Sequence, residues 1–314
     1  MKKMAKMNKD LFVTVVQEML EGKGLKTFVK EVTKREFSYL GIGKIPEAAG
    51  NKQNHVSAAV NIDDMYENYV SGKATIYDTV EFIYDTLTSI DNNIDEHVQF
   101  DFKKWEDVKP RLFVAAAKKS YNEEYLKDKV YLEIGDIALV VRIYVYTTND
   151  GEVASAAMPE PILKEYNLSK EDVVEAALKN STELFPGSCM NLSDVLQKFI
   201  PAGTMPAGEI DLWCVANGQN GGAAALFYPG MMNEIKEKLG GNFYILPSSM
   251  HEVLVISINA LQEKNMNAQD MIDLVRGVNK AEVSAEEQLS DNPLVYISGK
   301  LIDTVTGRII FVEK

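Results

Sequence analysis

Residues 243–258 read FYILPSSMHEVLVISI, and this stretch decides most about the fold. Its two apolar runs, 243–246 and 253–258, are rich in branched and aromatic side chains, which favour β-strands. The polar turn between them, PSSMHE at residues 247–252, contains proline and serine, which are typical of chain reversals. The stretch therefore predicts a β-hairpin that carries His251 and Glu252 in its turn.

Amphipathic helices are predicted where apolar residues recur at steps of three and four. The clearest helix covers residues 76–90, whose apolar residues are spaced four, three, four and three apart: Ile76, Val80, Ile83, Leu87 and Ile90. Other helices are predicted at 9–20, after the caps Asn61 and Ser169, and at 193–199, 231–239 and 268–278. Strands are predicted at 25–32, 37–42, 55–60, 137–146, 212–216, 294–297 and 308–312, with a hairpin turn at Asp150-Gly151.

This order of helices and strands does not alternate strictly. We therefore expect an α+β fold, with a mixed or antiparallel sheet and helices packed on one face. A chain of 314 residues usually exceeds a single core, so two domains are expected. The weak pattern between residues 91 and 129 predicts a smaller N-terminal α+β domain, 1–125, and a larger C-terminal domain, 126–314, that contains the hairpin.

The chain is acidic, with a formal net charge of -13 from 46 acidic and 33 basic residues. Nucleic-acid binding requires neutralisation of phosphates, so no nucleic-acid partner is expected. The apolar segment 11–16 is broken by Gln17 and Glu18, and no apolar run approaches the roughly 20 residues that span a bilayer. Together with only two cysteines, these features predict a cytoplasmic protein without a membrane association.

The patterns of metal and phosphate sites are missing from the sequence. His55, His97 and His251 are far apart and form no HxH or HExxH pattern, so no metal is expected. The glycines of NGQNGG at 217–222 lack both the Lys-Ser/Thr pair of phosphate loops and the spacing of dinucleotide sites. We therefore expect no cofactor.

One arrangement suggests catalysis. Cys189, in the turn PGSCMN, and His251 would form a thiol and base, with Glu252 or Asp194 to orient the base. These residue types are the minimum for a thiol-dependent hydrolase or transferase. The alternative is that Cys189 is a small buried apolar residue, which is common for a free cysteine, and the sequence favours this reading.

Binding residues are expected in the turns, because loops on a rigid sheet are frequent places for sites. The candidate turns are residues 186–191, 217–222 and 247–252. Their candidate binding residues are Ser188, Asn191, Asn220, Ser248, Ser249 and His251. Arg142, a charge in the apolar strand 137–146, is either the solvent-facing member of the alternation, which we favour, or a site residue.

Several segments resemble an uncharacterised family of cytosolic proteins from anaerobic Gram-positive gut bacteria. The segments are NSTELFP at 180–186, AAALFYPG at 223–230, FYILPSSMHEVLV at 243–255 and VNKAEVSAEEQLSDN at 278–292. The order of elements is also similar to a second uncharacterised Gram-positive family. The first resemblance implies a bacterial accessory protein, and it supplies no activity, cofactor or catalytic residue.

The sequence thus favours a non-catalytic binding or regulatory protein, with enzymatic activity left uncertain. The partner would be an unknown protein or small molecule. The chain would be a monomer or a small homo-oligomer.

Overall fold

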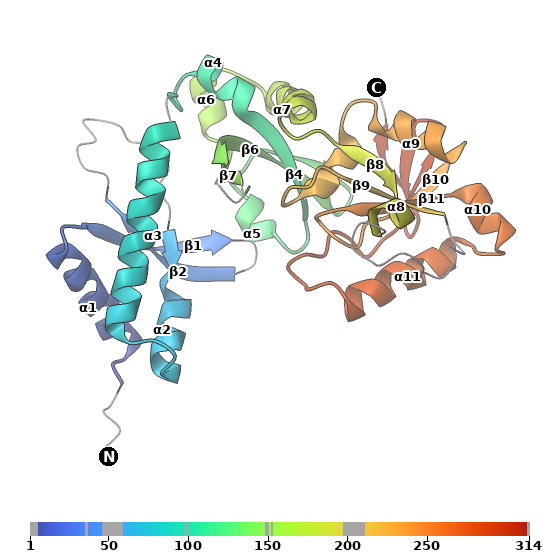
Figure 1. Cartoon of the computed structure of the whole chain (residues 1–314). Helices are drawn as coiled ribbons and strands as arrows, with labels where there is room; N and C mark the ends of the chain where they lie inside the picture. Colours follow the sequence, from blue (N-terminus) through green and yellow to red (C-terminus); the bar gives the residue numbers. More distant parts are fainter. Residues whose placement is uncertain are drawn as a thin grey trace. The chain divides into compact units, whose positions relative to one another are not determined.

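The computed structural model describes residues 6–34, 37–45, 59–97, 100–147, 151, 153–196 and 211–312. The chain divides into two compact units, Met1–Phe102 and Lys103–Lys314. The boundary expected from the sequence, between residues 125 and 126, lies within the second unit, in the short helix α5 (Glu123–Leu126). The prediction of an α+β chain is confirmed, and all of its described strand pairs are antiparallel (Figure 1).

The first unit combines three helices with a three-stranded sheet of order β1-β2-β3. Its elements are α1 (Lys9–Gly22), β1 (Thr27–Lys34), β2 (Phe37–Lys44), β3 (Ala59–Asn61), α2 (Ile62–Ser71) and α3 (Ile76–His97). The predicted cap Asn61 accepts the backbone N–H of Asp63 at 3.0 Å, and Gly72 ends α2 in the left-handed conformation. Apolar faces of α1 and α3 meet in one core that includes Phe12, Leu20 and Ile83.

The second unit begins with a four-stranded sheet in which the long strand β6 is central. Its strands are β4 (Leu112–Lys118), β5 (Tyr131–Ile134), β6 (Ile137–Thr147) and β7 (Val153–Ala157). The helical elements around it are α4 (Trp105–Val108), η1 (Lys109–Arg111), α5, α6 (Ile162–Tyr166) and α7 (Lys170–Leu184). Ser169 and Asp172 form a capping box at the start of α7, as the sequence predicts for Ser169. Strand β4 belongs to this sheet through its pairing with β6, which is why the unit begins before residue 126.

The remainder of the second unit is a seven-stranded sheet of order β14-β13-β12-β10-β11-β9-β8. Its strands are β8 (Ser188–Asn191), β9 (Leu212–Ala216), β10 (Phe243–Leu246), β11 (Val253–Ser257), β12 (Leu294–Ile297), β13 (Lys300–Asp303) and β14 (Ile309–Val312). The helical elements are α8 (Leu192–Leu196), η2 (Gly222–Phe227), α9 (Met231–Leu239), α10 (Ile258–Glu263) and α11 (Ala268–Ala281). The hairpin predicted from residues 243–258 is β10 and β11, in the interior of this sheet.

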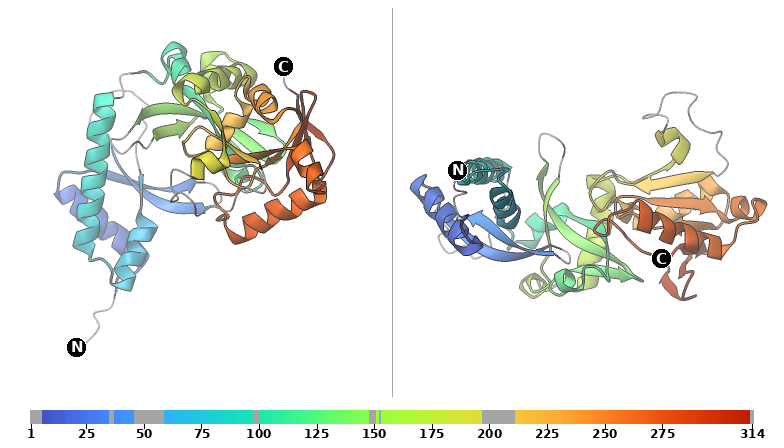
Figure 2. Two further views of the ribbon diagram at one scale, coloured as in Figure 1. Left: turned by 45° about the vertical axis from the view of Figure 1, so that its right-hand side comes forward. Right: turned by 90° about the horizontal axis from the view of Figure 1, so that it is seen from below.

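Helices cover both faces of the seven-stranded sheet, whereas the sequence prediction placed helices on one face (Figure 2). Leu261 of α10 and Met271 of α11 pack with Leu246 and Ile256 on one face. On the other face, the ammonium group of Lys238 in α9 lies 5.6 Å from the ring centroid of Trp213. Trp213 and Cys214 are consecutive in β9, so their side chains point to opposite faces. Trp213 lies on the face of α9, and Cys214 lies on the face of α10 and α11.

A few predicted features lie wholly or partly outside the described residues. They are most of the strand predicted at 55–60, the residue Asp150 and the end of the helix predicted at 193–199. Among the helices that the structure describes, none has the length and apolar character needed to cross a membrane.

Candidate functional site

The three turns singled out by the sequence begin at one edge of the seven-stranded sheet. Ser188, the first residue of β8, pairs with Ala216, the last residue of β9. Val253, the first residue of β11, pairs with Val215. Because neighbouring strands run in opposite directions, the chain before β8, after β9 and before β11 leaves the sheet at the same edge. We use the name loop edge for residues 186–188, 217–222, 247–252 and 284–291. The segment 284–291 is included because its main chain hydrogen-bonds to the hairpin turn.

Main-chain hydrogen bonds connect the hairpin turn to residues 284–291. The N–H of Met250 donates to the carbonyl of Glu287 at 2.8 Å, and the N–H of Leu289 donates to that of Ser248 at 3.2 Å. The N–H of Ser290 donates to the carbonyl of Pro247 at 2.9 Å. Sequence reasoning did not assign residues 284–291 to the site. The only available signal was that they lie in the family-like segment 278–292.

Loop 217–222 is held against both the hairpin turn and the four-stranded sheet. The N–H of Ala223 donates to the carbonyl of Met250 at 3.0 Å, and the N–H of Ala116 in β4 donates to the carbonyl of Gly221 at 2.9 Å. A Cβ on Gly221 would lie 2.8 Å from the Cβ of Ala115, and one on Gly222 would lie 2.7 Å from the carbonyl oxygen of His251. Both positions thus require glycine, because the main chain approaches its neighbours too closely for a side chain.

Tyr228 lies beneath this loop and is only 3% exposed. Its hydroxyl accepts a hydrogen bond from Nδ2 of Asn217 at 2.7 Å, and Asn217 Oδ1 in turn accepts the N–H of Gln219 at 2.9 Å. Burial raises the pKa of Tyr228 and outweighs the hydrogen bonds with Asn217 and Ser181, which lower it. A Cβ on Gly187 would lie 3.2 Å from Cδ2 of the same tyrosine ring. Tyr228 is therefore a common support for two of the predicted turns.

His251 faces residues 284–291 with a side chain that is 37% exposed. Its Nε2 lies 3.6 Å from Oε1 of Glu287, so its neighbouring carboxylate is Glu287. Its backbone N–H donates to Oγ of Ser249 at 3.0 Å, which fixes the turn as a serine motif. Ser248 and Ser249 are both half-buried, and the described part of the turn contains no GxSxG nucleophile elbow.

The other predicted binding residues are divided between this edge and the opposite end of β8. Asn220 is exposed at the tip of loop 217–222, and Ser188 Oγ donates to the carbonyl of Ala216 at 3.3 Å. Asn191, in contrast, is the last residue of β8. Its Nδ2 donates to Oδ1 of Asp211 at 2.6 Å, and its Oδ1 accepts the N–H of Ser193 at 2.9 Å. Asn191 therefore caps α8 and does not belong to the loop edge.

The structure separates Cys189 from His251. Cys189 pairs with Val215, and Val215 pairs with Val253, so Cys189 and Val253 lie two strands apart, about 10 Å between α-carbons. His251 precedes Val253 by two residues. Burial raises the pKa of the Cys189 thiol to about 11, although the charge of Lys238 lowers it. A nucleophilic thiol requires the opposite shift, towards a low pKa.

Glu252 is near the second cysteine. Burial, followed by the negative charge of Glu252, raises the pKa of Cys214 to about 11. Cys214 pairs with Leu254, on the face that α10 and α11 cover. The residues proposed from the sequence as thiol, base and orienting carboxylate thus lie in different surroundings.

A polar cluster borders the loop edge at Asp291. Lys118 Nζ lies 2.6 Å from Asp291 Oδ2, and Asn279 Nδ2 donates to Asp291 Oδ1 at 2.8 Å. Burial raises the pKa of Asp291, but the hydrogen bonds from Lys118 and Asn279 outweigh it, so the pKa lies below its ordinary value. The cluster connects the end of β4 to the segment after α11, and so restrains the loop edge from both sheets.

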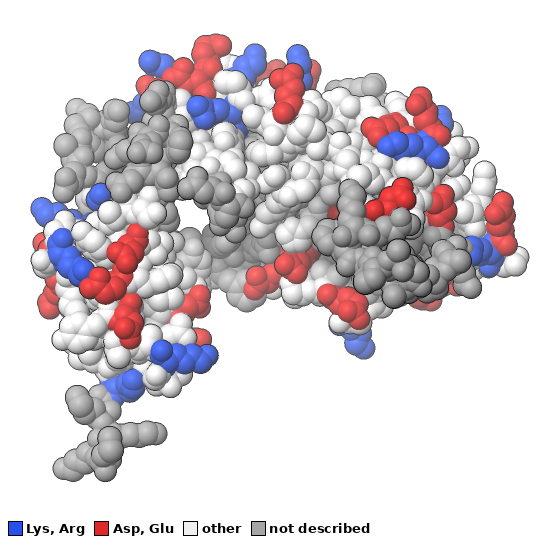
Figure 3. Space-filling model, viewed as in Figure 1, with Lys and Arg blue, Asp and Glu red and all other residues white. Residues whose placement is uncertain are grey.

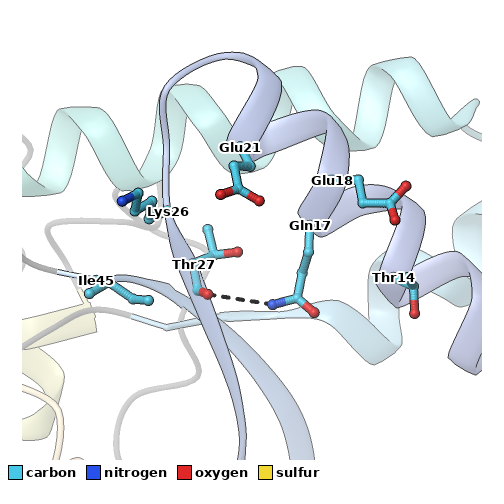
Figure 4. A pocket seen from close by; sticks show the side chains of 7 residues that line it. All are labelled: Thr14, Gln17, Glu18, Glu21, Lys26, Thr27 and Ile45. Carbon is cyan, nitrogen blue, oxygen red and sulfur yellow. Dashed lines mark hydrogen bonds between the residues drawn. The ribbon is translucent and has the colours of Figure 1, made fainter.

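A separate groove of about 310 Å³ lies in the first unit, between α1 and the start of β1 (Figure 4). It is lined by Thr14, Gln17, Glu18, Glu21, Lys26, Thr27 and Ile45. Nε2 of Gln17 donates to the carbonyl of Thr27 at 3.5 Å across it. Glu18, Glu21 and Lys26 are all exposed, so water solvates these charges and the groove lacks the apolar walls of a typical ligand pocket.

Charged side chains of both signs are interspersed over the face shown in Figure 3. Across the described ranges, no group of three or more His, Cys, Asp or Glu residues is placed to hold a metal ion.

Comparison with known protein families identifies a match over most of the chain. A model described as a family of unknown function (DUF5688) matches residues 8–298. Searches of curated proteins and of solved structures give no match. The predicted resemblance to a family without an assigned activity is confirmed at this level.

Proposed function

Since the chain belongs to the family of unknown function DUF5688, we propose a function from the chain's own site. The protein is a non-catalytic binding protein whose partner contacts the loop edge. The supporting observation is the set of main-chain hydrogen bonds that joins residues 217–222, 247–252 and 284–291. Because these bonds use backbone groups, they hold the loops in place while several polar side chains remain at the surface. A surface that is ordered before binding loses less conformational entropy when the partner arrives.

The chemistry of these side chains favours a polypeptide partner. The loop edge presents the amide of Asn220, the imidazole of His251, and the carboxylates of Glu287 and Asp291, which are half exposed. Enclosed small-molecule sites instead place a few polar groups in a mostly apolar cavity. Polar groups spread over several loops are typical of the rim of protein interfaces.

The proposal also includes a bacterial, cytoplasmic setting. The cytoplasmic setting is supported by the two free cysteines, as a reducing compartment would keep them, and the bacterial setting rests on the family resemblance of segments such as 243–255.

Photo-cross-linking in the cells that naturally contain this protein would test the proposal. A photoreactive amino acid is placed at Asn220, and a control is placed at Glu263, which is exposed in α10 beyond the opposite end of β11. We expect an adduct of defined mass from position 220 and little from position 263. His251→Ala and Glu287→Gln should reduce the yield at position 220.

Mass spectrometry of the adduct identifies the partner, and a second copy of the chain would identify the interface as homo-oligomeric. Equal yields from both positions, or no adduct from position 220, would exclude the loop edge as the binding surface.

A further inference from the structure

Arg142 places a positive charge on one face of the four-stranded sheet of the second unit. It pairs with Ala157 of β7, while Tyr144, two residues along on the same face, pairs with Ser155. Ser155 is therefore the diagonal neighbour of Arg142 across the two strands. A register shift between Tyr144 and Tyr146 interrupts the pairing here, and such irregularities are frequent where a strand positions a side chain for a site.

The guanidinium of Arg142 binds neutral groups. Nε donates to Ser155 Oγ at 2.9 Å, and Nη2 donates to the carbonyl of Ser155 at 3.1 Å. Nη1 donates to the hydroxyl of Tyr125 in α5 at a longer distance of 3.4 Å. A guanidinium has five N–H groups, so two remain beyond these three bonds. A partly buried cation usually has an anionic partner, and the structure places no carboxylate within 4.0 Å of this one among the described residues.

Helix α5 and the residues after it contain three acidic side chains, of which Glu123 is exposed and forms no ion pair with Arg142, and the other two are already paired. Glu124 forms an ion pair with Lys127, and Asp128 forms one with Lys129. Lys129 also lies over the ring of Tyr125, 5.6 Å from its centroid. None of these carboxylates forms an ion pair with Arg142. A hydroxyl, a carbonyl and a phenol require a hydrogen-bond donor and not a charge, so these contacts do not account for an arginine.

We propose that Arg142, Tyr125 and Ser155 form a carboxylate-binding site. Two N–H groups of a guanidinium match the two oxygens of a carboxylate, and the hydroxyls of Tyr125 and Ser155 are additional donors beside them. The site supplies one net positive charge, because Lys129 is paired with Asp128. A singly charged carboxylate balances that charge, whereas a doubly charged phosphate would leave a negative charge in partly buried surroundings. This site is independent of the loop edge.

NMR of the whole chain with ¹⁵N-labelled arginine provides a direct test, because the sequence contains only five arginines. The Nε–H signal of Arg142 is assigned from its absence in Arg142→Lys. Acetate is titrated against chloride at constant ionic strength, followed by inorganic phosphate. We expect a saturable shift of the Arg142 signal with acetate, with the other arginine signals changing at least several-fold less.

Two variants separate the site from a general salt effect. Tyr125→Phe keeps the ring and removes the hydroxyl, so it should weaken acetate binding several-fold, while Arg308→Lys, at an exposed position, should leave the affinity unchanged. A third titration with N-acetylglycine distinguishes sources, because tighter binding than acetate indicates a peptide C-terminus and equal binding indicates a small acid. No saturable shift with acetate, stronger binding of phosphate, or an unchanged affinity in Tyr125→Phe would each overturn the proposal.

Discussion

Gly221→Ala tests whether the loop edge depends on the close approach of loop 217–222 to β4. Gly221 has a φ of 80°, in the left-handed region, where an alanine costs about 1–2 kcal/mol. Its Cβ would also lie 2.8 Å from the Cβ of Ala115 and 3.1 Å from the backbone nitrogen of Ala116. Relief of such overpacking costs about 1–3 kcal/mol, and loss of the Ala116–Gly221 hydrogen bond adds about 1 kcal/mol. We expect a total destabilisation of about 3–6 kcal/mol.

Two neighbouring glycines separate these contributions. Gly218 has a φ of 73° and open space around its Cβ position, so Gly218→Ala should lose only the backbone contribution of about 1–2 kcal/mol. Gly222 lies outside the left-handed region, but its Cβ would lie 2.7 Å from both Asn217 Oδ1 and the carbonyl of His251. Gly222→Ala should therefore show the steric contribution alone, about 1–3 kcal/mol.

Urea denaturation followed by tryptophan fluorescence measures these differences. Both tryptophans, Trp105 and Trp213, belong to the unit that contains the loop, so the signal reports on that unit. Gly221→Ala should be the least stable of the three variants, because it combines the backbone and steric contributions that Gly218→Ala and Gly222→Ala show singly. If Gly221→Ala lost no more stability than Gly218→Ala, the packing of this loop against β4 would be refuted.

Three further predictions follow from buried polar groups. Because their pKa values are about 11, Cys189 and Cys214 should carry about 10²-fold less thiolate at pH 8 than a free cysteine. Iodoacetamide should therefore modify them slowly until urea unfolds the chain, and rapid modification of Cys189 in the native protein would contradict its burial. Tyr228→Phe should remove the buried hydroxyl that accepts the hydrogen bond of the Asn217 amide, and so destabilise the second unit by about 1–3 kcal/mol. Amide hydrogen exchange in loop 217–222 should become faster, and unchanged exchange would show that this bond does not hold the loop. Burial raises the pKa of Asp303, but hydrogen bonds from Thr306, Asn292 and Val305 outweigh it, so the pKa lies below its ordinary value. The carboxylate therefore stabilises the fold above the unfolded pKa of about 4, and this contribution is lost as the pH falls through the lower folded pKa. Asp303→Asn should reduce stability at pH 7 and make the acid side of a stability–pH curve less steep, and a curve parallel to that of the unmodified chain would contradict the assignment.

Local sequence patterns predicted the elements whose apolar periodicity is strong. The three- and four-residue spacing of residues 76–90 became α3, and the two apolar runs of residues 243–258 became β10 and β11. These predictions succeed because side-chain periodicity states which face of a helix or strand is buried, and that information is contained within about ten neighbouring residues. The turns at 217–222 and 247–252 were identified for the same reason, from proline, glycine and serine.

Tertiary structure decided how these elements combine. Nothing in residues 243–258 indicates that β10 pairs with β12, or that β11 pairs with β9, since strand pairing depends on segments distant in the chain. The same holds for residues 284–291, which contain no turn motif that points to the hairpin and yet hydrogen-bond to it. It also explains why the domain boundary was expected too late, because the partner of β4 is found only after residue 137.

The candidate site shows the same division between local and distant information. The residue types Cys189, His251, Glu252 and Arg142, and their places in turns or in a strand, could be read from the sequence. The sequence did not show their neighbours. In the folded chain Cys189 is buried two strands away from Val253, His251 faces Glu287, and Arg142 contacts Ser155 and Tyr125. Residue type fixes the chemistry that a side chain offers, whereas its pKa and its partners depend on burial and on neighbours brought from elsewhere in the chain.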